Sequence, residues 1–388
     1  MDDMTIDEEN AYRITERLSF PRLVGSEGEK KAIETVFDEF QNAGYEANRE
    51  TFETSFFNWI IVRFIFFPLA AILILSTYLL FISPVTSIIL SIIMLLVGMF
   101  VTRVSGSLGT FGKIYVTENL IGKLPSESNK VDMLYMAHWD SKSQTFPVLL
   151  RIIIFVVSIF GALVLAVLTI VGGFLALSGT LDLQFYWGIF IASIVIGVIA
   201  NLNVFNATGN NSPGSLDNAA SVGIMLELAR YFKANPPKNI NLTFISTGSE
   251  ELNLGGATDF VEKHKHEFDP SRTYFVNFDG VGGKGTIRLI TSYGFPKKSS
   301  SDKLNKLFMD VAKKKNIECK SLWLPVGAWS DYMPVIQAGF EACWLASAGS
   351  MLNVHRSSDN MDTISKLGLK NTLLLNVGII EKLDAELS

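Results

Sequence analysis

The chain has 388 residues and a formal net charge of −5. Hydrophobic residues make up 48% of it, charged residues 18%, and the mean hydropathy is +0.31. This composition is too apolar for an ordinary soluble enzyme and too charged at both ends for a pure transporter. The sequence shows no basic patch of the kind that would indicate a nucleic-acid partner.

The first polar segment predicts the start of a mixed helix and strand domain. Residues 27–43 place apolar side chains on one face and end before Gly44, which predicts a helix. Residues 45–52 predict a strand.

Two long stretches contain almost no charge. Residues 64–102 contain no Asp, Glu, Lys or Arg, and residues 152–216 contain only Asp182. A membrane-spanning helix needs about 20 apolar residues, so each stretch predicts two spans joined by a short turn. The predicted spans are 64–82, 86–102, 152–176 and 185–205, which form transmembrane hairpins 63–103 and 151–206.

The remaining polar segments predict one discontinuous domain made of residues 1–62, 104–150 and 207–388. Short strands and helices alternate along it, which predicts an α/β fold with a central, mostly parallel or mixed sheet flanked by helices. Predicted strands are 119–124, 132–137, 241–247, 273–278, 286–291, 319–323 and 340–345, and predicted helices are 219–233, 255–265 and 300–315.

The distribution of Lys and Arg predicts how the chain lies in a bilayer. Two hairpins return it to the same side, and the flanks on that side carry Lys and Arg while the hairpin tips carry none. We therefore expect a multi-pass integral membrane protein with four helices and its polar domain in the cytoplasm. Two cysteines, Cys319 and Cys343, suit a reducing compartment. Whether the helices only anchor the chain, form homo-oligomers or deliver substrate stays open.

Acidic and imidazole side chains follow one predicted strand after another. In α/β sheets, functional residues gather where the strands end. The candidates are His138, Asp140, Asp217, Glu250, Glu251, Asp279 and His355.

Imidazole and carboxylate together are typical ligands of zinc. Two ions that share a carboxylate need two imidazoles and two further carboxylates. The chain supplies this set as His138, Asp217, Glu251, Asp279 and His355. Glu250 is then left to move a proton, and Asp140 can hold the other nitrogen of His138. Taken alone, Asp217 could cap a helix and Asp279 could belong to a turn, but their joint occurrence favours a metal site.

Several segments resemble the co-catalytic zinc exopeptidase family of the bacterial leucyl-type aminopeptidases. Glutamate carboxypeptidases, glutaminyl cyclases and the transferrin receptor ectodomain are relatives of that family. The resemblance rests on residues 137–142 (AHWDSK), 216–221 (LDNAAS), 248–255 (GSEELNLG), 277–280 (NFDG) and 355–360 (HRSSDN), with weaker matches at 22–26, 119–122 and 329–332.

The resemblance implies roles for the candidate residues and two zinc ions per chain. Asp217 would bridge the ions, with His138 and Asp279 at one and Glu251 and His355 at the other. Glu250 would be the general base. Asp217 and Asn218 would be joined by a peptide bond that is often cis in the family. The pocket walls are predicted to include Trp139, Trp329 and Tyr332, and Tyr332 stands where many relatives have histidine.

These observations predict a membrane-embedded di-zinc aminopeptidase that acts on peptides. A glutaminyl-cyclase-like acyl transferase is one alternative. A carboxypeptidase is another, because Lys142 and Arg356 lie near the motifs and could bind a terminal carboxylate. A non-catalytic membrane scaffold is disfavoured because the whole ligand set is present.

Overall fold

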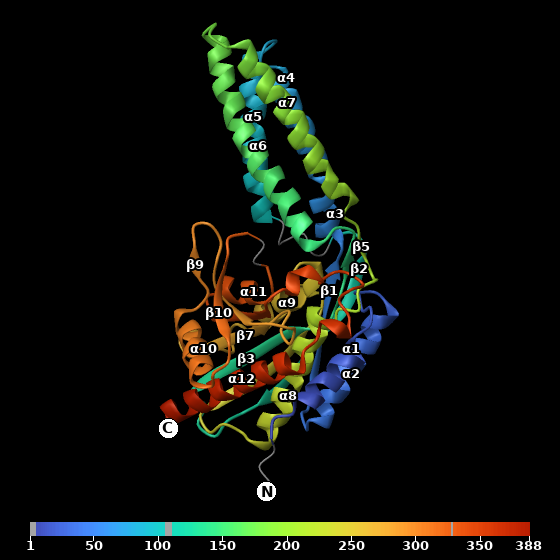
Figure 1. Ribbon diagram of the computed structural model, residues 1–388, viewed down its shortest axis with the longest axis vertical. Helices are drawn as coiled ribbons and strands as arrows, with labels where there is room; N and C mark the ends of the chain where they lie inside the picture. Colours follow the sequence, from blue (N-terminus) through green and yellow to red (C-terminus); the bar gives the residue numbers. More distant parts are fainter. Residues whose placement is uncertain (1–4, 105–110, 327–328) are drawn as a thin grey trace. The chain divides into compact units, whose positions relative to one another are not determined.

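The computed structural model describes residues 5–104, 111–326 and 329–388 (Figure 1). The chain divides into two compact units. The sheet unit comprises Met1–Thr54, Tyr115–Ser143 and Gly209–Ser388, and the helical unit comprises Ser55–Ile114 and Gln144–Thr208. The short strands β4 (Ser143–Gln144) and β5 (Thr208–Gly209) occupy sequence positions where the chain passes from one unit to the other.

Within the described residues, nine strands form one mixed sheet with the order β1-β2-β6-β3-β7-β11-β8-β10, and β9 pairs with β8. The central strands β6, β3, β7 and β11 are parallel neighbours. Strand β2 is antiparallel to β6, and β8 is antiparallel to β11. The carboxyl ends of the four central strands therefore meet at one edge. The bounds are β1 Asn48–Ser55, β2 Ile114–Leu124, β3 Val131–His138, β6 Ile240–Thr247, β7 Thr273–Phe278, β8 Ile287–Tyr293, β9 Lys298–Ser299, β10 Cys319–Leu324 and β11 Glu341–Ser347.

Helices cover both faces of this sheet, so β3 is buried at every residue. Because side chains alternate along a strand, Met133 and Tyr135 join one apolar cluster with α1, α2, α8, α10 and α12. Leu134 and Met136 join the opposite cluster with α9 and α11. The helices are α1 Glu8–Leu18, α2 Glu27–Asn42, α8 Ala220–Ala234, α9 Gly255–His264, α10 Asp302–Lys314, α11 Tyr332–Gln337 and α12 Lys366–Leu387.

The predicted α/β fold with a mixed central sheet is confirmed. The predicted strand 273–278 coincides with β7, and the other predicted strands and helices of the sheet unit are found within a few residues. Helices α1, α11 and α12 were not predicted. Helix α12 buries residues almost all round its first half, so its sequence lacks the one-sided apolar pattern that marks a surface helix.

The helical unit packs its long helices through small and apolar side chains. Its core includes Leu73, Leu165 and Ile189. The Thr77 and Ser193 hydroxyls lie 2.8 Å apart, one hydrogen bonding to the other. Large apolar side chains such as those of the exposed Phe67 and Val198 point outward. Apolar groups outside and satisfied hydroxyls inside are the arrangement that a lipid environment favours. The helices are α3 Phe57–Phe64, α4 Phe66–Tyr78, α5 Pro84–Val104, α6 Val148–Leu177 and α7 Leu183–Asn201.

Three helical stretches of the described chain are long and apolar enough to cross a membrane: Phe57–Tyr78, Val148–Leu177 and Leu183–Phe205. The predicted span 86–102 falls on α5. Within α5, the apolar stretch Pro84–Val97 is shorter than a span. Four spans therefore stay a prediction.

Candidate metal centre

The candidate residues come from the strand ends at one edge of the sheet. His138 is the last residue of β3, and Asp279 directly follows β7. Glu250 and Glu251 lie in a short turn after β6, entered through Ser249 in the left-handed region at φ 57°. His355 follows β11, beyond a short helical turn.

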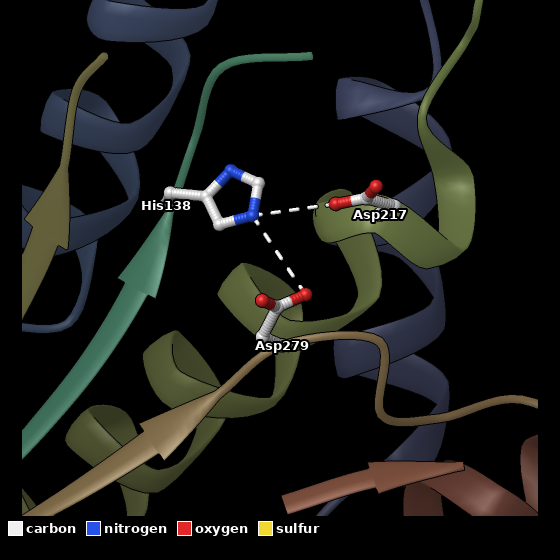
Figure 2. A group of neighbouring side chains, drawn as sticks. All are labelled: His138, Asp217 and Asp279. Atoms are coloured by element: carbon white, nitrogen blue, oxygen red, sulfur yellow. Dashed lines mark ion pairs between the residues drawn. The ribbon is translucent and has the colours of Figure 1, made fainter. Parts of the chain in front are cut away.

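His138, Asp217 and Asp279 converge as a first group of potential ligands (Figure 2). The Nε2 atom of His138 lies 3.3 Å from Asp217 Oδ1 and 3.9 Å from Asp279 Oδ1. This nitrogen is buried and makes no hydrogen bond. Ser330 Oγ donates to the other oxygen of Asp279 at 2.6 Å, so Asp279 Oδ1 is the oxygen turned toward the imidazole.

Asp217, Glu251 and His355 form a second group. The Nε2 atom of His355 lies 3.1 Å from Asp217 Oδ2 and 3.1 Å from Glu251 Oε2. Asp217 thus offers one carboxylate oxygen to each group. Burial opposes its ionisation, but contacts with both imidazoles outweigh burial and lower the pKa of Asp217 well below its usual range.

The two groups fit a pair of divalent cations in their chemistry. The potential ligand atoms of each group lie within 4.8 Å of one another. They are imidazole nitrogen and carboxylate oxygen, the donors that zinc takes. Several carboxylates gathered in a buried place repel one another unless cations compensate them. The structure brings together all five residues that the sequence singled out.

Glu250 lies beside both groups without belonging to either. Its Oε2 atom is 3.8 Å from His138 Nε2. Burial raises the pKa of Glu250 well above its usual range, His138 lowers it, and the charges of Asp279 and Glu251 raise it further. A carboxyl group with a raised pKa next to a metal site is suited to accepting and releasing a proton.

Asp140 contacts both the imidazole of His138 and the turn that carries Glu250 and Glu251. Its carboxylate lies 3.4 Å from His138 Nδ1, as the sequence predicts, and its backbone oxygen lies 3.1 Å from the same nitrogen. The carboxylate also accepts hydrogen bonds from the backbone N–H groups of Glu250 and Glu251, both at 3.2 Å. This second contact was not predicted, and it fixes the turn that carries both glutamates.

Asn218 links the Asp217 turn to the end of β7. The Asp217–Asn218 peptide bond is cis, as the resemblance implied. The Asn218 side chain donates to the Phe278 backbone oxygen at 2.8 Å and accepts from the Gly280 N–H at 3.1 Å. These bonds hold Asp217 and Asp279 in register with each other.

Three further residues support the centre without having been assigned a role from the sequence: Arg22, Asp331 and Asp359. A fourth, Lys142, was considered from the sequence only as a cation for a terminal carboxylate. The buried Asp359 carboxylate accepts from the N–H groups of Leu216 and Asp217, at 2.8 and 3.1 Å. The buried Arg22 guanidinium donates to the backbone oxygens of Trp139 and Gly214, and so joins the segments that carry His138 and Asp217. The available sequence signals were the family matches at 22–26, 329–332 and 355–360, which contain Arg22, Asp331 and Asp359.

Asp331 lies in the loop that also supplies Ser330. Thr247 Oγ1 at the end of β6 donates to one oxygen of Asp331. Burial raises the pKa of Asp331 to about 7, and His138 acts in the opposite direction. Asp331 is therefore a second carboxyl group next to the candidate metal centre whose pKa is raised by burial.

The predicted wall residues differ in their exposure. Trp139 is 0% exposed, and its indole N–H donates to the Glu118 backbone oxygen. Tyr332 is also 0% exposed and packs against Trp344. Both side chains belong to the interior and do not form an open wall. Trp329 is 63% exposed, so of the three it alone is accessible to a substrate.

Comparison with known proteins gives matches in sequence and in fold. The sequence profile of Peptidase family M28 matches residues 200–378, a range that contains every candidate ligand except His138. Aminopeptidase YwaD of Bacillus subtilis is 32% identical over 132 residues, which cover 34% of this chain and 28% of that protein. The vacuolar membrane protease of Schizosaccharomyces japonicus is 37% identical over 79 residues, or 20% of this chain and 9% of that protein. The chain thus spans less than a third of the length of these curated relatives.

Solved structures share the fold at low sequence identity. A zinc aminopeptidase from Bacillus subtilis superimposes with a TM-score of 0.56 at 14% identity, covering 98% of this chain and 96% of that one. A glutaminyl cyclase from an Acidobacteriales bacterium gives a TM-score of 0.58, also at 14% identity, covering 100% of this chain and 97% of that one. The likeness to both establishes the fold and does not choose between their reactions.

Proposed function

The chain carries a domain of Peptidase family M28, and from this premise we propose that it is a membrane-embedded zinc metallopeptidase that removes N-terminal residues from peptides. Metallopeptidase chemistry is what the family and its aminopeptidase relatives have in common. The finer proposal, two zinc ions and an aminopeptidase reaction, rests on the residues of the sheet unit.

The observation that carries this proposal is the sharing of Asp217 between two ligand groups. One oxygen lies 3.3 Å from His138 and the other 3.1 Å from His355. We propose that His138, Asp217 and Asp279 hold one zinc ion, and that Asp217, Glu251 and His355 hold the other. Zinc held in this way supplies Lewis acidity toward a carbonyl oxygen and lowers the pKa of a water molecule.

Glu250 moves the proton in the proposed mechanism. Its carboxylate takes a proton from the attacking water and delivers it to the amine nitrogen that leaves. Burial raises the pKa of Glu250, which makes its carboxylate a stronger base toward this proton. Asp140 keeps Glu250 in place through the backbone N–H of that residue.

The charges around the centre favour a free amino terminus over a free carboxyl terminus. A substrate ammonium group suits a site lined by Glu250, Asp279 and other carboxylates. A carboxypeptidase would need a cation that faces the substrate. Lys142 is buried and pairs with Glu251 at 2.7 Å, so it is not directed at a terminal carboxylate. This contact disfavours the carboxypeptidase alternative.

The membrane part of the proposal rests on the helical unit. We propose four spans that form two hairpins, with the sheet unit on the cytoplasmic side. The three long apolar helices and the match to a vacuolar membrane protease support residence in a membrane. Labelling of single cysteines introduced at the hairpin tip, Ser178–Asp182, and at the exposed Arg356 tests the orientation. Labelling of position 356 from outside intact cells would contradict it.

Incubation of the purified protein with a mixed peptide library tests the reaction itself. We expect products that lack single N-terminal residues, and we expect a chelator to abolish them. Products that lose ammonia from an N-terminal glutamine without losing a residue would instead indicate a cyclase. Loss of C-terminal residues would indicate a carboxypeptidase.

A further inference from the structure

Lys142 is a charged side chain placed where charged side chains are rarely found. It is 5% exposed, and it follows His138 by only four positions. Burying an ammonium group is unfavourable unless it is paired and hydrogen bonded. Its partners therefore indicate what its burial accomplishes.

Two of those partners are atoms of Glu251. The Lys142 ammonium lies 2.7 Å from Glu251 Oε2 and donates to the Glu251 backbone oxygen at 3.1 Å. The Asp140 carboxylate accepts the Glu251 N–H. Residues 138–142 thus hold Glu251 by its backbone N–H, its backbone oxygen and its carboxylate, while the same segment supplies His138 to the other ligand group.

The oxygen held by Lys142 is also the oxygen that belongs to the second ligand group. Glu251 Oε2 lies 3.1 Å from His355 Nε2. The orientation of the Glu251 carboxylate therefore depends both on Lys142 and on His355. Lys142 and His355 together lower the pKa of Glu251 to about 2 against the effect of burial.

In the first ligand group, the hydrogen bond that orients the carboxylate comes from a neutral donor. Asp279 receives a hydrogen bond from the neutral hydroxyl of Ser330 on the oxygen that points away from His138. A charge-assisted hydrogen bond is roughly twice as strong as a neutral one and is more directional in its effect. The two groups share Asp217, but only the second has an ammonium group on one of its own carboxylates among the described residues.

We propose that Lys142 is a positioning residue for the second metal site, where it fixes the Glu251 carboxylate toward His355 and so sets the affinity of that site separately from the first. This inference rests on the proposed function, because it concerns the binding of the second zinc ion. It assigns to Lys142 a role that differs from the substrate contact considered for it from the sequence.

The test measures zinc binding and does not depend on turnover. Zinc is titrated into the metal-free full chain in competition with a chromophoric chelator, and bound zinc is counted for each variant. Lys142→Met removes the ammonium group and keeps most of the side-chain length. Partners that orient metal ligands are typically worth about 10–100-fold in metal affinity. We expect the second ion to bind weaker by about that factor in Lys142→Met, with the first ion bound as in the unchanged protein.

Two further variants make the result specific. Lys142→Arg keeps the positive charge and should recover most of the lost affinity. Lys263→Met removes an exposed lysine that also pairs with a carboxylate, Asp259, at 2.7 Å, and it should bind both ions normally. If Lys142→Met does not fold, Lys142→Gln, which keeps an N–H donor, serves for the same titration.

Three outcomes would overturn the inference. Normal binding of both ions by Lys142→Met would show that Lys142 does not position the ligand. Tighter binding of the second ion would show that the ammonium group opposes the metal instead. Equal weakening of both sites would show that the effect is not selective. Failure of the unchanged protein to bind zinc is a separate result, and it would contradict the proposed function itself.

Discussion

The sheet unit and the helical unit both bury polar side chains, but the groups that they bury differ in kind. In the helical unit the buried polar groups include small hydroxyls, and Ser87 Oγ, for example, donates to the Ser76 backbone oxygen at 2.6 Å. In the sheet unit they include several carboxylates, the imidazole of His138 and the ammonium group of Lys142, gathered at one edge. Hydroxyls can be satisfied within helices, whereas a cluster of like charges needs cations from elsewhere.

This difference in buried polar groups indicates a different role for each unit. The helical unit hydrogen bonds buried hydroxyls such as those of Thr77 and Ser193 to each other and presents large apolar side chains outward, which suits a structural role in lipid. The sheet unit leaves His138 Nε2 buried without a hydrogen bond, between two carboxylates. Deleting a polar group should therefore abolish function in one unit and merely loosen packing in the other.

The largest effect is expected for Asp217→Asn. The substitution removes the charge that both ligand groups share, so both ions should be lost. Because partners that only orient ligands are worth about 10–100-fold, we expect zinc affinity at both sites to fall by more than about 100-fold. Zinc content after gel filtration and peptide turnover measure the result. Retention of both ions by Asp217→Asn would contradict the proposal that the two ligand groups depend on a shared carboxylate.

A smaller effect is expected from Asp359, a buried carboxyl that supports the Asp217 turn. Burial raises the pKa of Asp359 to about 6 from an ordinary value of 3.8. Because the pKa of Asp359 is higher in the folded chain, the folded chain binds more protons than the unfolded chain at pH values between 3.8 and about 6. The free energy of unfolding of the metal-free protein should therefore fall as pH rises from about 4 to 6, by up to about 3 kcal/mol.

Thermal unfolding of the metal-free protein at pH 4.5 and at pH 7 tests this sign. Asp359→Asn cannot titrate, so its midpoint should depend less on pH than that of the unchanged protein. Because Asn offers one acceptor oxygen where two are used, its midpoint should also be lower overall. An unchanged pH dependence would mean that Asp359 is not the responsible group.

The smallest effect is expected for Thr77→Val in the helical unit. The variant keeps the shape of the side chain and removes the hydrogen bond to Ser193. Side-chain hydrogen bonds between membrane helices average about 0.6 kcal/mol, so thermal stability in detergent should fall slightly while zinc content and turnover stay unchanged. Ser193→Ala removes the same bond from the other side and should behave alike. Loss of turnover in both variants would contradict a purely structural role for these groups.

Much of the fold and of the ligand set could be predicted because both depend on local pattern. Strand β3 ends at His138, Asp279 directly follows β7, and Glu251 follows β6 after a short turn, so parallel pairing of these apolar strands brings the three residues to one edge. The cis bond after Asp217 was implied by the resemblance and is present.

The supporting residues could not be predicted because they depend on distant contacts. Arg22 hydrogen bonds to Gly214, which is 192 positions away in the sequence, and Thr247 to Asp331, which is 84 positions away. A local sequence pattern does not predict pairs that lie so far apart in the chain. Trp139 directly follows the candidate ligand His138, and this proximity suggested a pocket wall. Neighbouring side chains at a strand end point to opposite sides, and that of Trp139 points into the interior.

Glu250→Gln separates the two tasks of the proposed active site, which are holding the metal and moving the proton. Glu250 belongs to neither ligand group, so the variant should keep two zinc ions per chain. Since a general base typically contributes about 10²–10⁴-fold to the rate, the release of N-terminal residues should fall by that factor. Zinc content and turnover are measured on the same preparation. Two ions with turnover reduced by this factor are the predicted result, and turnover equal to that of the unchanged protein would contradict the account.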